Sequence, residues 1–366
     1  MKNMGKYIYA AIVAMILFVP IADATARKYM GPTDMTNWFK GPTCMEIDEA
    51  DSNNTKKIDC NEADIRVYES QWIVPNAFHN GNFDQLENLY SNWLREDARY
   101  AGGTSKTSLL CSTLEDTMGG TEIQFSLAKI QKWQKLYKDS FLSKYAEAAY
   151  WRASAWSARG GGYSRTVTRE GWALFRDRLM RASSLLDALQ EKASEHPAWY
   201  TLKIDIMIDA GEPIENIKKV YLKGISIFPK SHAIYFAMAR AYTPLYGGTP
   251  KSFDKFVSDT VERTKNFEGN SFYARLYWTA DDDNNLPFVN ESSKYPNWPT
   301  LKTAYLDLMQ HYPDSIWNKN RFALVACRTD DGPLYRKLRT EIEGQIIDGM
   351  FPPGERDKCD LKHKWH

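Results

Sequence analysis

The sequence predicts an all-α protein made of stacked helix hairpins, and three observations lead to this prediction. Apolar residues recur at helical spacing through most of the chain after residue 80. Proline stands at several breaks between these segments, and an aromatic residue follows it within a turn or two. No strand-like alternation competes in this region. Hairpins that bury a face only against their neighbours stack into a tetratricopeptide-like α-solenoid or a compact helical body.

The first 26 residues have the parts of an export signal. Lys2 and Lys6 form a charged start, residues 7–19 form an apolar run, and residues 24–26 (A-T-A) form a small-residue cleavage site. The apolar run is too short for a good membrane span. We therefore expect cleavage near Ala26 and a mature periplasmic or secreted protein without stable membrane insertion. An uncleaved N-terminal anchor is the alternative.

Length and charge limit the function classes. Cleavage leaves about 340 residues, which is one large or two average domains. Loss of Lys2, Lys6 and Asp23 lowers the formal net charge from +1 to 0. The remaining lysines and arginines are spread along the chain, and nucleic-acid binding needs them gathered in a basic stripe. We therefore expect neither a nucleic-acid partner nor a polybasic membrane contact.

The chain has five cysteines, and an exported protein meets a compartment that permits disulfides. Cys44 and Cys60 flank a polar loop, so we predict that they pair. Cys327 could pair with Cys359 and hold the C-terminal tail, or it could be a small core residue in its apolar surroundings. Because five is odd, at least one thiol remains, which we predict to be Cys111.

The elements follow in order. Residues 27–80 are predicted to be irregular, although 65–74 fits either a short strand or a short helix. A helical-repeat domain is predicted over 81–349, followed by a frayed tail over 350–366. The predicted helices share a helical apolar period, and they cover 82–93, 123–139, 144–158, 168–195, 198–209, 214–227, 231–241, 251–266, 271–280, 299–311, 315–328 and 332–347. Pro197 and Pro229 are about one tetratricopeptide period apart but Pro313 breaks the spacing, so any repeat is degenerate.

Several phrases within 81–349 occur in a recognisable order. They are N-F-D-Q-L-E-N-L at 82–89, A-W-S-A-R-G-G-G-Y at 155–163, Y-G-G-T at 246–249, Y-A-R-L-Y-W at 273–278 and N-R-F-A-L-V-A-C at 320–327. On these phrases the stretch resembles a bacterial family called domain of unknown function 4034. It departs from the family at T-P-L, just before Tyr246, where an aromatic or basic residue is expected. The resemblance implies a helical, tetratricopeptide-like fold and no reaction, because the family has none assigned.

The first candidate site is the corner where a predicted helix stops at three glycines. Arg152, Trp156 and Arg159 share one helix face, and Tyr163 follows the glycines. A guanidinium beside an indole and a phenol can clamp a carboxylate, a sugar or a peptide. The alternative is a structural corner, in which Arg159 caps the last carbonyls of the helix and stacks on Trp156.

The second candidate group is Tyr246, Tyr273, Arg275 and Trp278. Polar and aromatic residues on the inner helices of a solenoid usually line its concave binding face. The alternative is aromatic packing between helices, because a chain with 13% aromatic residues must place most of its rings in the core.

Metal and cofactor sites are not expected. Cys359, His363 and His366 have ligand-like spacing but stand at the extreme C-terminus, where a frayed tail is more typical. Residues 281–285 resemble part of a calcium loop without its glycine and distal glutamate.

Catalytic motifs are incomplete. Ser126 and Lys129 match S-x-x-K, but no K-T-G follows. Glu147 lies among alanine and aromatic residues and could be a buried general acid, although an ion pair with a neighbouring arginine is the plainer alternative.

We therefore expect a non-enzymatic protein that binds another protein in the bacterial cell envelope through Trp, Tyr and Arg anchors, for instance as an adaptor or as the immunity partner of an effector. The alternative is an envelope enzyme or a binder of a small molecule, glycan or peptide that uses the corner of Trp156, Arg159 and Tyr163. A deep pocket with a carboxylate beside stacked rings would favour this alternative. A shallow groove in which every carboxylate is exposed or paired would count against it.

Overall fold

The computed structural model describes residues 62–119, 123–282, 295–347 and 349–365. These residues form helices joined by turns, and the only strand-like pairing among them is an isolated antiparallel bridge between Arg99 and Ser105. The prediction of an all-α fold is therefore confirmed. In the described part of the chain, no helix has both the length and the apolar character needed to cross a bilayer.

The helices follow one another with short connections. They are α2 (Glu62–Tyr68), α3 (Val74–Asn80), α4 (Phe83–Arg95), α5 (Lys106–Gly119), α6 (Ile123–Leu136), α7 (Phe141–Arg159), α8 (Arg169–Asp187), α9 (Pro197–Asp209), α10 (Ile214–Ile227), α11 (His232–Arg240), α12 (Pro250–Glu268), α13 (Ser271–Asp282), α14 (Trp298–His311), α15 (Ile316–Arg328), α16 (Gly332–Glu341) and α17 (Glu355–His363). A π-helical turn, Glu69–Ile73, joins α2 to α3.

Local sequence signals set many helix starts. The side chains of Asn82, Ser140 and Thr168 each accept a hydrogen bond from the backbone N–H three residues later. Such caps satisfy one of the N–H groups that the first helical turn leaves without a partner. Thr249 and Ser252 form a reciprocal capping box at α12.

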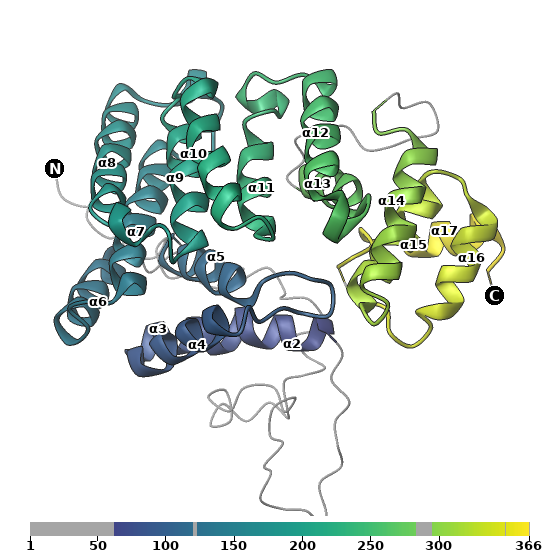
Figure 1. Ribbon diagram of the computed structural model, residues 1–366, viewed down its shortest axis with the longest axis horizontal. Helices are drawn as coiled ribbons and strands as arrows, with labels where there is room; N and C mark the ends of the chain where they lie inside the picture. The colour runs from purple at the N-terminus through teal and green to yellow at the C-terminus, as the bar shows by residue number, and fades with distance from the viewer. Residues whose placement is uncertain (1–61, 120–122, 283–294, 348, 366) are drawn as a thin grey trace, which may run out of the picture.

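The helices form an arch that is closed by the N-terminal part of the described chain. Figure 1 shows α6 to α17 following one another around the arch, with α2 to α5 across its open side. At one end α2 packs on α15, and at the other α5 packs on α7 and α9. Contacts between residues far apart in sequence thus join the two ends of the arch through the N-terminal helices. The core runs through all these elements, and its largest fully buried side chains include Phe78, Trp133, Tyr235, Tyr305 and Tyr335.

The N-terminal part differs from the prediction. Residues 62–80 were expected to be irregular apart from a short strand or a short helix over 65–74, but they form α2, the π-helical turn and α3, and they bury Val74, Ala77 and Phe78 in the main core. The helical body therefore begins near residue 62 rather than 81. The predicted signal over 1–26 and the Cys44–Cys60 pair lie outside the described residues.

The C-terminal part differs too. The expected frayed tail contains α17, which is tied to α15 by a disulfide between Cys327 and Cys359. His363 is 5% exposed, and Asp360 accepts hydrogen bonds from Tyr335 and Arg339 of α16. The disulfide and these polar contacts order the tail. Cys111 is a free, buried thiol, as predicted.

Two predicted helix ends and one unpredicted helix also differ from the expectation. The predicted helix over 168–195 ends at Asp187, and a separate 3-10 turn follows at Gln190–Lys192. The predicted helix over 332–347 ends at Glu341. Finally, no helix was predicted where α5 lies.

Candidate functional site

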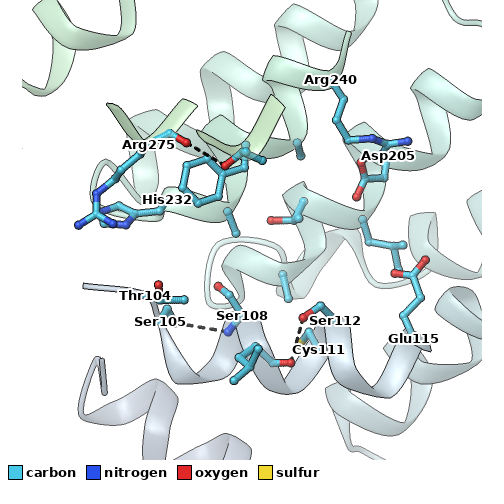
Figure 2. Close-up of a pocket in the computed structure, with 18 of the residues that line it drawn as sticks. Thr104, Ser105, Ser108, Cys111, Ser112, Glu115, Asp205, His232, Arg240 and Arg275 are labelled. Carbon is cyan, nitrogen blue, oxygen red and sulfur yellow. Dashed lines mark hydrogen bonds and ion pairs between the residues drawn. The ribbon is translucent and has the colours of Figure 1, made fainter. Parts of the chain in front are cut away.

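A cavity of about 640 Å³ lies inside the closed arch. Its walls come from α5 on one side and from α9, α11, α13 and α15 on the other, with Arg66 of α2 beside them. This volume lies within the range of small-ligand sites, about 300–1,000 Å³. Figure 2 shows side chains of α5 facing side chains of the other helices across this space.

Polar contacts around Gly102 hold the N-terminal helices across the cavity. Its backbone N–H donates to Glu62 Oε1 (2.6 Å), and its carbonyl accepts from Arg275 Nη2 (2.7 Å). Ser315 Oγ donates to the other oxygen of Glu62 (2.5 Å). Gly102 thus joins α2, α13 and the start of α15 at one point. A side chain would not fit there, because a Cβ on Gly102 would lie 2.6 Å from Glu62 Oε1 and 2.9 Å from Ser315 Oγ.

The acidic end of the cavity is a network of ion pairs. Arg152 contacts Glu115 and donates to Asp209 Oδ2 through Nε (2.6 Å). Arg240 contacts Asp205 and reaches Asp209 Oδ1 at 3.2 Å. Asp209 is fully buried between the two guanidiniums, whereas Glu115, Asp205 and Arg240 line the cavity. Burial raises the pKa of Glu115, the charge of Arg152 lowers it, and the charges of Asp205 and Asp209 raise it further; the net shift is upward.

The opposite end of the cavity is basic and aromatic. The Arg66 guanidinium lies 4.2 Å from the ring centroid of Trp317 and 5.3 Å from that of Tyr100. Within the described residues it makes no hydrogen bond. Burial lowers the pKa of Arg66, and the nearby charge of Glu62 opposes this shift. Trp278 stacks on Trp317 with a centroid distance of 6.2 Å. This end of the cavity is therefore lined by two indole rings and by the Arg66 guanidinium, whose N–H donors are unused within the described residues.

A buried histidine lies at the same end. His232 is 4% exposed, and its Nε2 lies 2.8 Å from Glu268 Oε1. Burial and the charge of Arg275 lower the pKa of His232 to about 4, although Glu268 acts in the other direction. Burial alone would raise the pKa of Glu268, but hydrogen bonds from His232 and Tyr312 and the charge of Arg275 lower it to about 2. His232 is therefore neutral at pH 7, with Nε2–H donating to Glu268 and Nδ1 free of any hydrogen bond.

The two long walls differ in chemistry. Hydroxyl groups face the cavity from Ser108 and Ser112 of α5 and from Ser105 just before it, and the three recur at helical spacing (Figure 2). The facing wall includes Leu202 and Phe236. Cys111 also lines the cavity, but burial raises the pKa of its thiol to about 12, so it stays protonated and unreactive at neutral pH.

The structure joins parts of the two predicted site groups. Arg152 and Trp156 of α7 both donate to Asp209 of α9, with Trp156 Nε1 at 2.9 Å. Tyr246 accepts a hydrogen bond from Arg240 Nη2 at 2.7 Å. Arg152 therefore belongs to the acidic network, and Trp156 and Tyr246 contact the network from outside the cavity. Arg152 and Trp156 do not form the surface clamp described for the corner.

The remaining corner residues lie apart from the cavity. Arg159 donates to the carbonyls of Gly160 and Gly162, and its guanidinium lies over the rings of Trp156 and Trp172 at 5.2 and 5.1 Å. This geometry matches the structural alternative for Arg159. Tyr163 is 79% exposed and packs only loosely, with Arg165 5.5 Å from its ring centroid.

The second predicted group divides as well. Arg275 and Trp278 line the cavity, whereas Tyr273 is buried and donates to Asp254 of α12 (3.0 Å). One face of α13 thus lines the cavity, and another packs in the core.

The other residues singled out from the sequence contribute to packing and hydrogen bonding outside the cavity. Glu147 accepts hydrogen bonds from Gln134 and Trp151, so its recorded partners are neutral. Ser126 is buried on α6. Cys359 is in a disulfide and cannot be a zinc ligand, and the described residues contain no cluster of His, Cys, Asp and Glu that fits a metal ion. Residues 283–285 lie outside the described part of the chain.

Several residues of the cavity were not predicted. Asp205 and Asp209 are one helical turn apart in a mostly apolar run, Y-T-L-K-I-D-I-M-I-D. Paired carboxylates on a buried helix are the signal that could have identified them, because buried charges need partners. Arg66, Glu115 and His232 carry no comparable signal, since their meeting depends on the closure of the arch.

Comparisons with protein families, with curated proteins and with solved structures found no match. The family resemblance of 81–349 therefore stays a prediction.

Proposed function

We propose that the protein binds a small polar molecule in its central cavity and does not transform it. The observation that carries this proposal is the cavity itself, a space of about 640 Å³ with charged groups at both ends and hydroxyl groups between them. A site built only for packing would be filled with apolar side chains, because protein interiors are close-packed. Ligand sites combine apolar walls with a few placed polar groups, as here.

Closure of the arch supports a small ligand over a protein partner in this place. A helical-repeat protein commonly binds partners on its concave surface. Here α2 and α5 contact the inner helices α15 and α9, so the chain's own helices cover that surface. The alternative considered from sequence, a binder of a small molecule or peptide, therefore has better support at this site than a protein adaptor.

The pairing of the carboxylates supports binding without catalysis. Glu115 and Asp205 face the cavity, but each contacts an arginine, so both belong to an ion-pair network rather than standing as free acids beside the ligand. His232 is held by Glu268, and the hydroxyls that face it belong to a helix rather than to an oxyanion hole. The Cys327–Cys359 disulfide fits an oxidising compartment, so we place this binding in the periplasm or outside the cell.

A thermal-shift screen tests the proposal. The full chain is melted with free amino acids, di- and tripeptides, monosaccharides and nucleotides. Ligands that bind only the folded state raise the melting temperature. In Ser108→Trp the indole occupies the cavity, and in the matched control Ser184→Trp it lies on the exposed surface of α8. We expect a shift in the wild type and in Ser184→Trp that Ser108→Trp loses. Absence of any shift that depends on Ser108 would contradict the proposal.

A further inference from the structure

We infer that the ligand is a short zwitterionic peptide, held with its ammonium group at Glu115 and Asp205 and its carboxylate at Arg66. This inference rests on the proposed function and names the ligand class. Figure 2 shows Glu115 at one end of the cavity and Arg275 and His232 at the other, so the cavity has two ends of different charge chemistry.

The acidic end carries more negative than positive charge. Its ion-pair network contains three carboxylates, those of Glu115, Asp205 and Asp209, and the two guanidiniums of Arg152 and Arg240. The fully ionised network therefore has one excess negative charge, which a bound cation would balance. A buried excess negative charge is unfavourable. A bound cation would neutralise it, and this relief would strengthen the binding of the cation.

The two cavity-facing carboxylates have room for this cation. Their side chains are 20% and 16% exposed, for Glu115 and Asp205 respectively, whereas Asp209 is fully buried. Within the described residues, the second oxygen of each of the two accepts no hydrogen bond. An ammonium group has three N–H donors, so it can bridge two carboxylates that approach from α5 and α9.

The other end offers donors that nothing in the described chain uses. Arg66 is fixed between the rings of Trp317 and Tyr100, and its guanidinium makes no hydrogen bond with the described residues. A guanidinium presents a planar fork of N–H groups that matches a carboxylate in two parallel hydrogen bonds. Arg275 does not compete for that role, because it donates to the Gly102 carbonyl and lies 3.7 Å from Glu268.

The middle of the cavity suits a peptide backbone. Ser105, Ser108 and Ser112 supply hydroxyls that both donate and accept, as peptide N–H and C=O groups require. At the basic end, His232 Nδ1 is buried without a partner and is an acceptor, because Nε2–H donates to Glu268. A volume of about 640 Å³ is that of a site for a drug-sized ligand, so a short peptide fits the space better than one amino acid.

Calorimetric titration of the full chain with trialanine tests the inference. The comparison ligands are N-acetyl-trialanine, trialanine amide and cadaverine, which lack the ammonium, the carboxylate and the carboxylate with the backbone, respectively. We expect trialanine to bind, and each capped peptide to bind about tenfold more weakly, because each loses one charge-assisted contact. Equal affinity for free and capped peptides, or binding of cadaverine alone, would overturn the inference.

Variants assign each end of the peptide. Glu115→Gln should abolish the discrimination against the acetylated peptide and keep that against the amide, and Arg66→Met should do the reverse. Glu262→Gln and Arg95→Met make the same changes at exposed positions and should behave as the wild type. If Glu115→Gln does not fold, Asp205→Asn makes the same test from α9.

The outcomes separate this inference from the proposed function. If another compound in the thermal screen binds in a Ser108-dependent way while trialanine does not bind, the cavity is a ligand site and the peptide inference is wrong. If no small molecule binds in that way, both are wrong.

Discussion

At the residue scale, the cavity depends on charges that are placed where burial penalises them. The Asp209 side chain has no exposed surface. Arg152 and Arg240 each contact one of its oxygens and so compensate the cost of burying its charge. Trp156 adds a third donor. Removal of one partner leaves the others buried and uncompensated, which costs about 3–5 kcal/mol in comparable pairs. The geometry of the acidic end therefore requires the whole network.

His232 gives a pH-dependent prediction. The folded protein binds its proton near pH 4, and the unfolded chain binds it near 6.5. Between these values the unfolded state holds more protons, so this residue lowers stability as the pH falls from 7. The contribution is about 2 kcal/mol at pH 5. Urea unfolding of the wild type and His232→Gln at pH 7.5 and 5.0 measures it.

The expected result is a smaller loss of stability in His232→Gln between the two pH values. His196, whose pKa burial also lowers to about 4, contributes equally to both proteins and cancels in the comparison. An identical pH dependence of the two proteins would show that His232 is protonated normally in the fold.

At the scale of elements, most helices could be predicted from sequence, but α5, which lies along the cavity, could not. α4 has Phe83, Leu86 and Tyr90 buried at helical spacing, and an asparagine cap marks its start, so sequence predicts it well. α5 faces the core with Leu110 and Leu114 and the cavity with serines, and hydroxyls on its inner side hide the apolar stripe. Because these hydroxyls lie between the apolar positions, α5 separates its apolar and polar faces only weakly, and such predictions depend on that separation.

For the C-terminal tail, the sequence offered the Cys327–Cys359 pair only as one of two alternatives, and it did not predict helix α17. Pairing of Cys327 with Cys359 depends on their meeting in space, since their spacing of 32 residues permits many arrangements. Charged side chains dominate α17, so its sequence is typical of a solvated tail. Contacts of Asp360 and Glu355 with arginines on α16 and α15 make it part of the body.

This disulfide gives a prediction for α17. Closing a loop of this length stabilises a fold by about 3–4 kcal/mol on the chain-entropy model. The Cys327→Ala/Cys359→Ala variant should therefore unfold at lower urea concentration, and hydrogen exchange in α17 should rise first. In reducing agent, the wild type should unfold at the same urea midpoint as the variant. The midpoint of the variant should not change when reducing agent is added. Equal midpoints for variant and oxidised wild type would contradict the prediction.

At the scale of the whole molecule, the proposed binding of a ligand depends on closure of the arch. Sequence identifies separate helices, but Glu62, Gly102, Arg275 and Ser315 meet only because segments 173 and 253 residues apart come together. No local pattern encodes that meeting. For this reason the sequence candidates around Trp156 were near the cavity but not in it, and Arg66 was not among them.

Gly102 tests this closure. In Gly102→Ala the added Cβ displaces Glu62 and Ser315, and we expect a loss of about 1–3 kcal/mol together with faster hydrogen exchange in α2. Gly161→Ala is the matched control, because nothing lies within 4 Å of its added Cβ. Unchanged exchange in α2 of Gly102→Ala would show that Gly102 does not hold the arch closed.

The most direct test of a ligand in the cavity is native mass spectrometry of the full chain after incubation with a dialysable extract of the producing cells. The central claim predicts a small bound mass on the wild type and on Ser184→Trp, and its absence from Ser108→Trp, whose indole fills the cavity. No bound mass on the wild type, or the same bound mass on Ser108→Trp, would contradict it.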